Sequence, residues 1–293
     1  MPETSALDDV LRSAVRVRIS SSISSSGGLI DGKIVVDLSD RAERDRLRVA
    51  MSVESPLQWR CMCGGDVRFE FFDADARHLT AVVLHHGAML RWEGWAGDAV
   101  LTDGQGLLRW LHARGAPGPL RKAEEDELRR VQRKLEEERW LAAMPDALDD
   151  LSDRLLGLSR SPEIVSSGFL VELHDRVRQA IPDSTGRALA LLAWHSGGTG
   201  RCSGYPVHED VPSLLLKDLP IGDIIAALQD PRADARHHAG AVRHLVGWKT
   251  RHNQQSDIDA VPEALKARLL HSARTSGDED KQGRAERWLA GRS

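Results

Sequence analysis

The residues best suited to chemistry fall in two short stretches, one in each half of the 293-residue chain. The first stretch holds Cys61 and Cys63, and the neighbouring pair His85 and His86 follows it. Thiolate and imidazole groups are the usual ligands of zinc in proteins, and four of them must converge on a tetrahedron. The residue types therefore raise the possibility of a zinc centre, which depends on the backbone that carries them.

The pattern around the cysteines predicts a backbone that does not suit a metal. Apolar residues alternate with polar ones over residues 57–63, which is typical of a strand. In a strand Cys61 and Cys63 lie along one face, whereas the neighbours His85 and His86 point to opposite faces. We therefore expect no metal and no other cofactor, with both cysteines as small buried residues. If a metal were bound, Cys61, Cys63 and His85 would be its ligands.

The second stretch is the loop at residues 195–209, which is rich in glycine. Its glycines can bend backbone N–H groups towards an anion, for which Arg201 would supply charge. In the alternative interpretation the loop is structural, with tight turns at the glycines and Tyr205 packed back onto a helix. The candidate ligand-binding residues are Gly197, Gly198, Gly200, Arg201 and Tyr205.

The same loop contains the residue types of a cysteine-dependent enzyme. Cys202 would be the nucleophile, His195 or His208 its base, and Glu209 or Asp210 the acid that orients the base. Proximity in sequence does not establish this geometry, so whether the chain is an enzyme stays open at this stage.

A third group of residues is a candidate interaction surface. His86, Arg91, Trp92 and Trp95 surround several glycines and would form an aromatic wall for a partner. In the alternative interpretation the two tryptophans are buried, covering the edge of the sheet where helices dock.

The elements that position these residues change character along the chain. Up to about residue 95 apolar residues tend to alternate, with strands expected at 15–19 and 34–38 and a meander over 57–92. In the meander Leu79, Ala81 and Val83 are expected on the inner face. We predict an α+β fold, with a mostly antiparallel sheet domain at residues 1–117.

Beyond residue 104 the apolar period becomes that of amphipathic helices. A charged connecting helix is expected within residues 118–145, and an all-helical domain at 146–293. The helices expected in that domain cover residues 146–157, 162–181, 184–195, 211–229, 232–247, 262–274 and 279–290.

One part of the helical half resembles a HEAT-type repeat, over about residues 219–247. The resemblance rests on Leu228, the turn Asp230-Pro231, the pair Ala235-Arg236, Ala239 and Leu245. It implies a HEAT-like helical hairpin within an irregular helical array. The pair His237-His238 departs from the small residues usual at this point of the repeat.

Composition limits the class of protein. The chain is 41% hydrophobic and 29% charged with a net charge of −4, and neither half is strongly basic, so we expect no nucleic-acid partner. Apolar runs are too short for a membrane span, and three cysteines do not make a disulfide framework. The excess of arginine over lysine indicates a GC-rich bacterial genome.

We therefore expect a cytoplasmic bacterial interaction or scaffold protein that binds another protein through its helices. The alternative is a hydrolase or transferase with a small-ligand site in the loop at 195–209.

Overall fold

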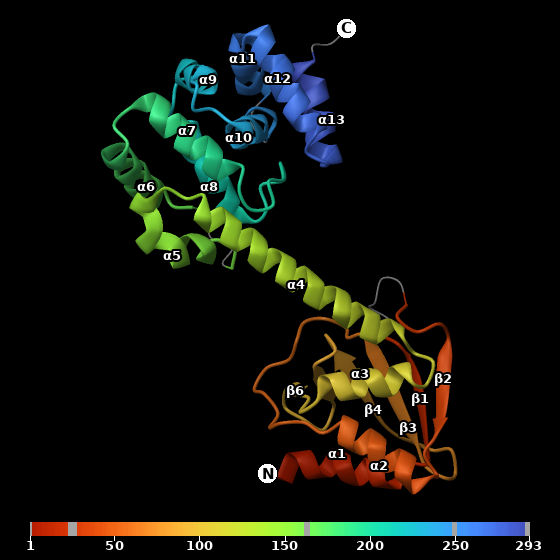
Figure 1. The fold of residues 1–293 in the computed structure, drawn as a ribbon. Helices are drawn as coiled ribbons and strands as arrows, with labels where there is room; N and C mark the ends of the chain where they lie inside the picture. Colours follow the sequence, from red (N-terminus) through yellow and green to blue (C-terminus); the bar gives the residue numbers. More distant parts are fainter. Residues whose placement is uncertain (1, 23–27, 161–164, 248–250, 291–293) are drawn as a thin grey trace. The chain divides into compact units, whose positions relative to one another are not determined.

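The chain folds into two compact units, residues 1–130 and 131–293, in a computed structural model that describes residues 2–22, 28–160, 165–247 and 251–290. We call them the sheet unit and the helical unit. The division falls inside helix α4 (Gly118–Ala142), which matches the charged helix expected within residues 118–145 (Figure 1).

The sheet unit is built on a six-stranded antiparallel sheet with the order β2-β1-β3-β4-β5-β6. The α+β fold class is therefore confirmed. The strands are β1 (Arg16–Ser21), β2 (Lys33–Asp37), β3 (Val67–Phe72), β4 (His78–His85), β5 (Met89–Trp92) and β6 (Ala99–Val100).

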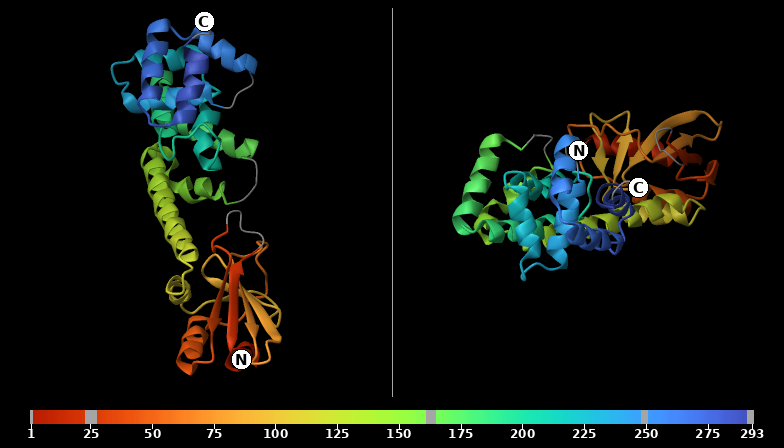
Figure 2. Two further views of the ribbon diagram at one scale, coloured as in Figure 1. Left: turned by 90° about the vertical axis from the view of Figure 1, so that its right-hand side faces the viewer. Right: turned by 90° about the horizontal axis from the view of Figure 1, so that it is seen from above.

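One face of this sheet forms the core of the unit. Val17 and Ile19 of β1 and Phe69 and Phe71 of β3 are fully buried, because alternate side chains of a strand share a face. Three helices add buried side chains to this core, and Figures 1 and 2 show them packed beside the sheet. They are α1 (Pro2–Ser13), which the sequence analysis missed, α2 (Arg41–Ala50) and α3 (Gly104–His112).

The inner face of β4 differs from the prediction. Phe71 pairs with Thr80 and Phe69 with Val82, and directly paired residues of antiparallel strands share a face. Thr80, Val82 and Leu84 are therefore the buried side chains, not Leu79, Ala81 and Val83. A register shift between Phe71 and Phe72 offsets the alternation across the turn, which the sequence pattern does not reveal.

The strand expected at residues 57–63 is also wrong, because this segment is an irregular loop. The place beside β3 belongs to β1, whose Ile19 lies directly opposite Phe69. The segment instead runs beside the chain just before β6: Leu57 N–H donates to the Asp98 carbonyl, and Asp98 N–H donates to the Trp59 carbonyl. We call residues 57–66 the cysteine loop.

The helical unit contains the remaining helices. They are η1 (Asp146–Leu151), α5 (Ser152–Gly157), α6 (Ser167–Ala180), α7 (Ser184–His195), η2 (Val207–Asp210), α8 (Val211–Leu216), α9 (Ile221–Gln229), α10 (Ala235–Val246), α11 (Arg251–Ala260), α12 (Glu263–Arg274) and α13 (Glu279–Leu289).

Two differences from the expected helices have simple causes. The helix expected at 211–229 is two helices, since Pro220 has no N–H for a continuous helix and stands before α9. Helix α11 was missed because its sequence is polar on most sides. The start of the helix expected at 162–181 lies outside the described residues.

The segment that resembles a HEAT repeat contains α9 and α10. Helix α10 packs chiefly against α7 and α12, and α7 also packs against α9. The resemblance to a HEAT hairpin stays a prediction. Among the described helices, none has the length and apolar character that crossing a membrane requires.

Candidate metal centre

The sheet unit brings Cys61, Cys63, His85 and His86 together. The two sulfur atoms lie 3.1 Å apart, and His85 Nδ1 lies 2.9 Å from the Cys63 sulfur. His86 Nε2 lies 3.3 Å from each sulfur. The ligand atoms of Cys61, Cys63 and His85 all lie within 4.8 Å of one another. Two sulfurs and the His85 nitrogen thus share one small volume, and the His86 nitrogen lies beside both sulfurs.

The expectation that these side chains diverge was wrong, for two reasons of backbone geometry. Cys61 and Cys63 are in an irregular loop, so their sulfurs are not held at the spacing of one strand face. His86 has a φ of 52°, which ends the alternation of β4 at His85. Its N–H donates to the Asp66 carboxylate at 2.6 Å, which holds this turn.

The ion pair of Arg91 and Asp98 holds the backbone of the cysteine loop. Asp98, with no exposed surface, pairs with Arg91 at 2.9 Å and accepts the Cys61 N–H at 2.7 Å. Arg91 also donates to the carbonyl groups of Cys61 and Cys63. Three backbone groups of the Cys-X-Cys segment are therefore bound by one pair of side chains.

Close packing explains the glycine at position 97, and the His85 ring is also packed inside the sheet unit. Gly97 has no room for a side chain, because a Cβ there would overlap the Leu57 carbonyl of the cysteine loop. His85 is fully buried, and its Nε2 has no hydrogen-bond partner among the described residues. The Nδ1 atom of that ring is the one that faces Cys63.

The electrostatics of the four groups suit a cation. The hydrogen bond from Cys63, followed by that from His86, lowers the pKa of Cys61 to about 7. Burial raises the pKa of Cys63 and lowers the pKa of His85, so His85 is neutral at neutral pH. A thiolate and a neutral imidazole are the forms that bind zinc, and a cation would favour the second thiolate.

Three of the four residues of the candidate interaction surface are buried or half-buried. Trp95 is 2% exposed and packs edge-on against Trp92, whose indole N–H donates to Thr80. Arg91 belongs to the ion pair behind the cysteine loop, and only His86 of the four is exposed. Trp95 is buried and Trp92 is half-buried, which favours the alternative interpretation.

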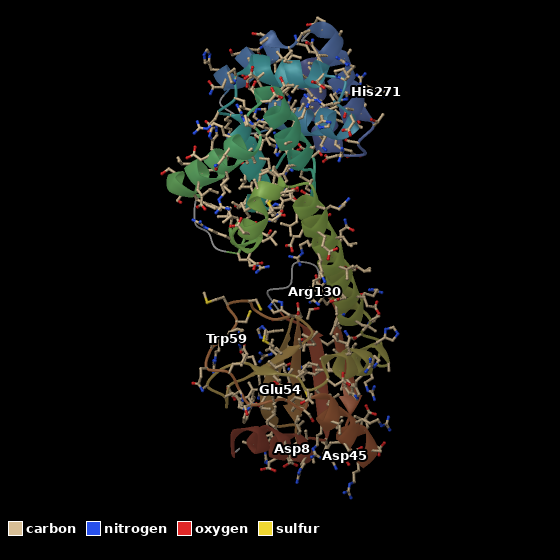
Figure 3. All side chains as sticks on the ribbon, turned by 60° about the vertical axis from the view of Figure 1, so that its left-hand side comes forward. Asp8, Asp45, Glu54, Trp59, Arg130 and His271 are labelled. Carbon is tan, nitrogen blue, oxygen red and sulfur yellow. The ribbon has the colours of Figure 1, made fainter. Side chains whose placement is uncertain are left out.

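The cysteine loop presents two apolar side chains that the sequence analysis did not single out. Trp59 is 54% exposed and Met62 is fully exposed, and Figure 3 shows Trp59 at the surface of the sheet unit. The strand expected at residues 57–63 would have placed Trp59 on the face of the cysteines and Met62 on the other face.

The glycine-rich loop of the helical unit does bind a carboxylate, but it is the chain's own. The Thr199 N–H and hydroxyl both donate to Glu209 at 2.7 Å, and Arg243 pairs with the same carboxylate at 2.8 Å. Gly198 has a φ of 67°, and a Cβ there would overlap Glu209. Glu209 and Arg243 are buried. Gly198 therefore lets the backbone approach an internal anion.

The other residues of this loop do not converge on a site. Arg201 and Tyr205 are exposed, so Tyr205 does not pack back onto a helix, while Gly197 lies against Trp140. Arg243 donates to the carbonyl groups of His195 and Arg201. These contacts favour the structural interpretation of the loop.

The cysteine nucleophile predicted in this loop is poorly placed for catalysis. Cys202 is 4% exposed, and burial raises the pKa of its thiol. His208 Nδ1 bonds to the Ser159 hydroxyl at 2.8 Å, and the ring of His195 lies against that of His244. Glu209 is held by Arg243, so it does not orient either histidine through its carboxylate.

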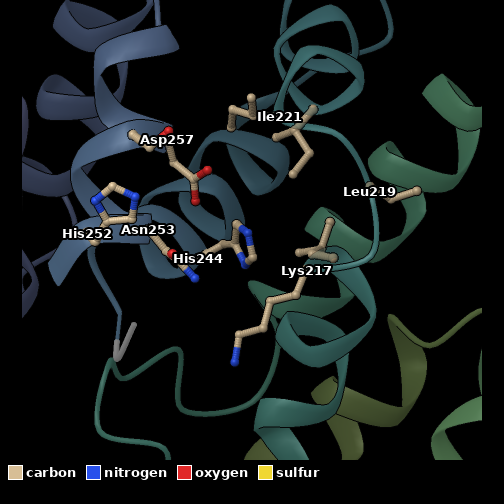
Figure 4. Close-up of a pocket in the computed structure, with 10 residues that line it drawn as sticks. Lys217, Leu219, Ile221, His244, His252, Asn253 and Asp257 are labelled. Carbon is tan, nitrogen blue, oxygen red and sulfur yellow. The ribbon is translucent and has the colours of Figure 1, made fainter. Parts of the chain in front are cut away.

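A cavity of about 660 Å³ lies elsewhere in the helical unit (Figure 4). Leu216 and Ile224 lie at its apolar side, with Lys217, His252 and Asp257 among its polar lining. None of the residues predicted above lines this cavity.

Comparison of the chain with models of known families, with curated protein sequences and with solved structures finds no match.

Proposed function

We propose that the sheet unit binds one zinc ion through Cys61, Cys63, His85 and His86. The observation that carries this proposal is the convergence of two sulfurs and two imidazole nitrogens from two separate segments. Zinc accepts four such ligands, with bonds of about 2.3 Å to sulfur and about 2.0 Å to nitrogen. The proposed ion would tie the cysteine loop to the end of β4.

The proposed role of the ion is structural. A site with four protein ligands has no open position for water or substrate, which a catalytic zinc site keeps. This supports the interaction or scaffold function expected from the sequence, and we propose that the chain binds another protein. Because the thiols must stay reduced, we propose a reducing compartment such as the cytoplasm.

Metal analysis of the purified full-length chain tests the proposal. We expect about one equivalent of zinc, and substitution with Co²⁺ should give the intense visible absorption of a tetrahedral thiolate complex. A chelator should lower the melting temperature of the wild-type protein, because an ion that binds only the folded state stabilises it.

The chain offers a matched control for the cysteine ligands. Cys61→Ser should lose the metal and the effect of the chelator, whereas Cys202→Ser should keep both, since Cys202 lies in the other unit. A wild-type protein that takes up no zinc from a reduced, metal-supplemented solution would contradict the proposal.

A further inference from the structure

The two sulfur atoms of the candidate metal centre are also neighbours of each other. Two sulfurs bound to one tetrahedral zinc would lie about 3.8 Å apart, given bonds of about 2.3 Å. Here they lie 3.1 Å apart, on residues separated by one position in an irregular loop. A disulfide spans Cα separations of about 4.4–6.8 Å, a range open to residues two apart in an irregular loop.

Access to the two sulfurs differs from access to the third thiol. Cys61 and Cys63 are partly exposed, whereas Cys202 is buried in the helical unit. The exposed His86 lies 3.3 Å from both sulfurs, whereas only the Cys63 sulfur also lies beside the buried His85. A small oxidant in solution therefore meets the Cys61 side of the pair first.

We infer that Cys61 and Cys63 form a reversible oxidation site, at which a hydroperoxide joins the two sulfurs in a disulfide and expels the metal ion. The inference rests on the proposed function, because it concerns the regulation of the same site. Arg91 and Asp98 hold the backbone of the loop through contacts that do not involve either sulfur. The loop is therefore kept in place for reduction and renewed metal binding.

The reaction balances as two displacements. The Cys61 thiolate attacks one peroxide oxygen, so that an S–O bond forms, the O–O bond breaks and the leaving oxygen takes up a proton. The Cys63 thiolate then attacks the Cys61 sulfur, forming the S–S bond and releasing the oxygen as water after a second proton is taken up. The sulfurs lose two electrons, the peroxide gains them, and zinc leaves as an unchanged divalent ion.

Hydrogen peroxide added to the zinc-loaded full-length chain tests this inference. We expect release of one zinc ion for each Cys61–Cys63 disulfide formed, measured with a chromophoric chelator and by peptide mapping after alkylation. Dithiothreitol followed by zinc should restore metal binding. Cys202→Ser should behave as the wild-type chain does.

A second variant separates disulfide formation from general loss of metal. Cys63→His keeps four possible zinc ligands but cannot form the disulfide, so it should retain its zinc under the same treatment. If this variant binds no zinc, the peptide map of the wild-type chain shows whether zinc release accompanies the Cys61–Cys63 disulfide. Zinc retained by the wild-type chain in excess peroxide, or released without the Cys61–Cys63 disulfide, would overturn the inference. A chain that binds no zinc before peroxide is added would contradict the proposed function itself.

Discussion

The side chain of Arg91 holds the backbone that carries the proposed metal ligands Cys61 and Cys63. Arg91 joins three carbonyl or carboxylate groups at the back of the cysteine loop, including those of Cys61 and Cys63. Outer contacts of this kind orient metal ligands, and their loss typically weakens metal binding by about 10–100-fold. Arg91 is therefore the residue whose geometry, rather than charge alone, should matter for the metal.

The substitution Arg91→Lys tests this role. Lysine keeps a cation beside Asp98 but lacks the planar fork that reaches several acceptors at once. We expect zinc affinity to fall by about 10–100-fold, measured by competition with a chromophoric chelator. The matched control is Arg77→Lys, an exposed arginine paired with Asp75, which should bind zinc as the wild type does. Equal affinity in the two variants would show that Arg91 does not position the ligands.

Sequence reasoning found the right residue types but not their geometry. Cys61, Cys63 and His85 were identified as ligands, and then set aside because a strand was assumed beneath the cysteines. The left-handed backbone at His86 is uncommon for any residue other than glycine, so no local pattern predicts it. The internal partner of the glycine-rich loop, Glu209, was close in sequence, but Arg243 on α10 comes from much later in the chain.

At the scale of elements, helix positions were easier to predict than strand pairing. Helix α7 has the bounds expected for it, because Asp183 caps its first turn and its apolar residues have the helical period. Strand partners depend on residues far away in sequence: β1 took the position beside β3 that residues 57–63 were expected to fill. Long-range pairing leaves little trace in a local pattern.

The crossing of α7 and α10 depends on a glycine. A Cβ at Gly240 of α10 would overlap the Leu192 carbonyl of α7. We expect Gly240→Ala to destabilise the helical unit by about 1–3 kcal/mol, because an extra methyl group in a close contact forces the backbones apart. Urea denaturation followed by circular dichroism would measure the change.

The control for this prediction lies in α13. Gly283 is inside that helix, and nothing lies within 4 Å of a Cβ built there. Gly283→Ala should therefore stabilise the protein by up to about 1 kcal/mol, through the better helix propensity of alanine. If the two alanine variants change stability in the same direction, the close crossing is not what Gly240 provides.

For the whole molecule, the two units should respond to different conditions. The sheet unit is the one that a chelator should destabilise, since it carries the proposed zinc ligands. The helical unit has buried histidines, and burial lowers the pKa of His208 to about 4 and that of His195 well below its usual value. The free energy of unfolding of the helical unit should therefore fall as the pH is lowered.

The sign of this dependence follows from the lowered pKa. In the unfolded chain His208 is protonated below about pH 6.5, whereas in the folded chain it is protonated only below about pH 4. Acid between these two values therefore favours the unfolded state. Each pH unit in this interval should cost up to about 1.4 kcal/mol of stability per histidine. We expect the free energy of unfolding of the helical unit to fall between pH 7 and pH 5, measured by urea denaturation.

Two variants test whether His208 causes this pH dependence of stability. His208→Gln should flatten the pH dependence, whereas His271→Gln, at an exposed position on α12 (Figure 3), should leave it unchanged. If His208→Gln and the wild type had the same pH dependence of the free energy of unfolding, protonation of His208 would not be its cause.

The full exposure of Met62 between the two cysteines has a practical consequence. A side chain that contacts nothing in the folded chain can be exchanged without loss of packing, so position 62 accepts a label. A small environment-sensitive fluorophore attached through a non-natural amino acid there would sit one residue from each sulfur. The fluorescence of the labelled chain would then report the proposed metal binding and oxidation directly.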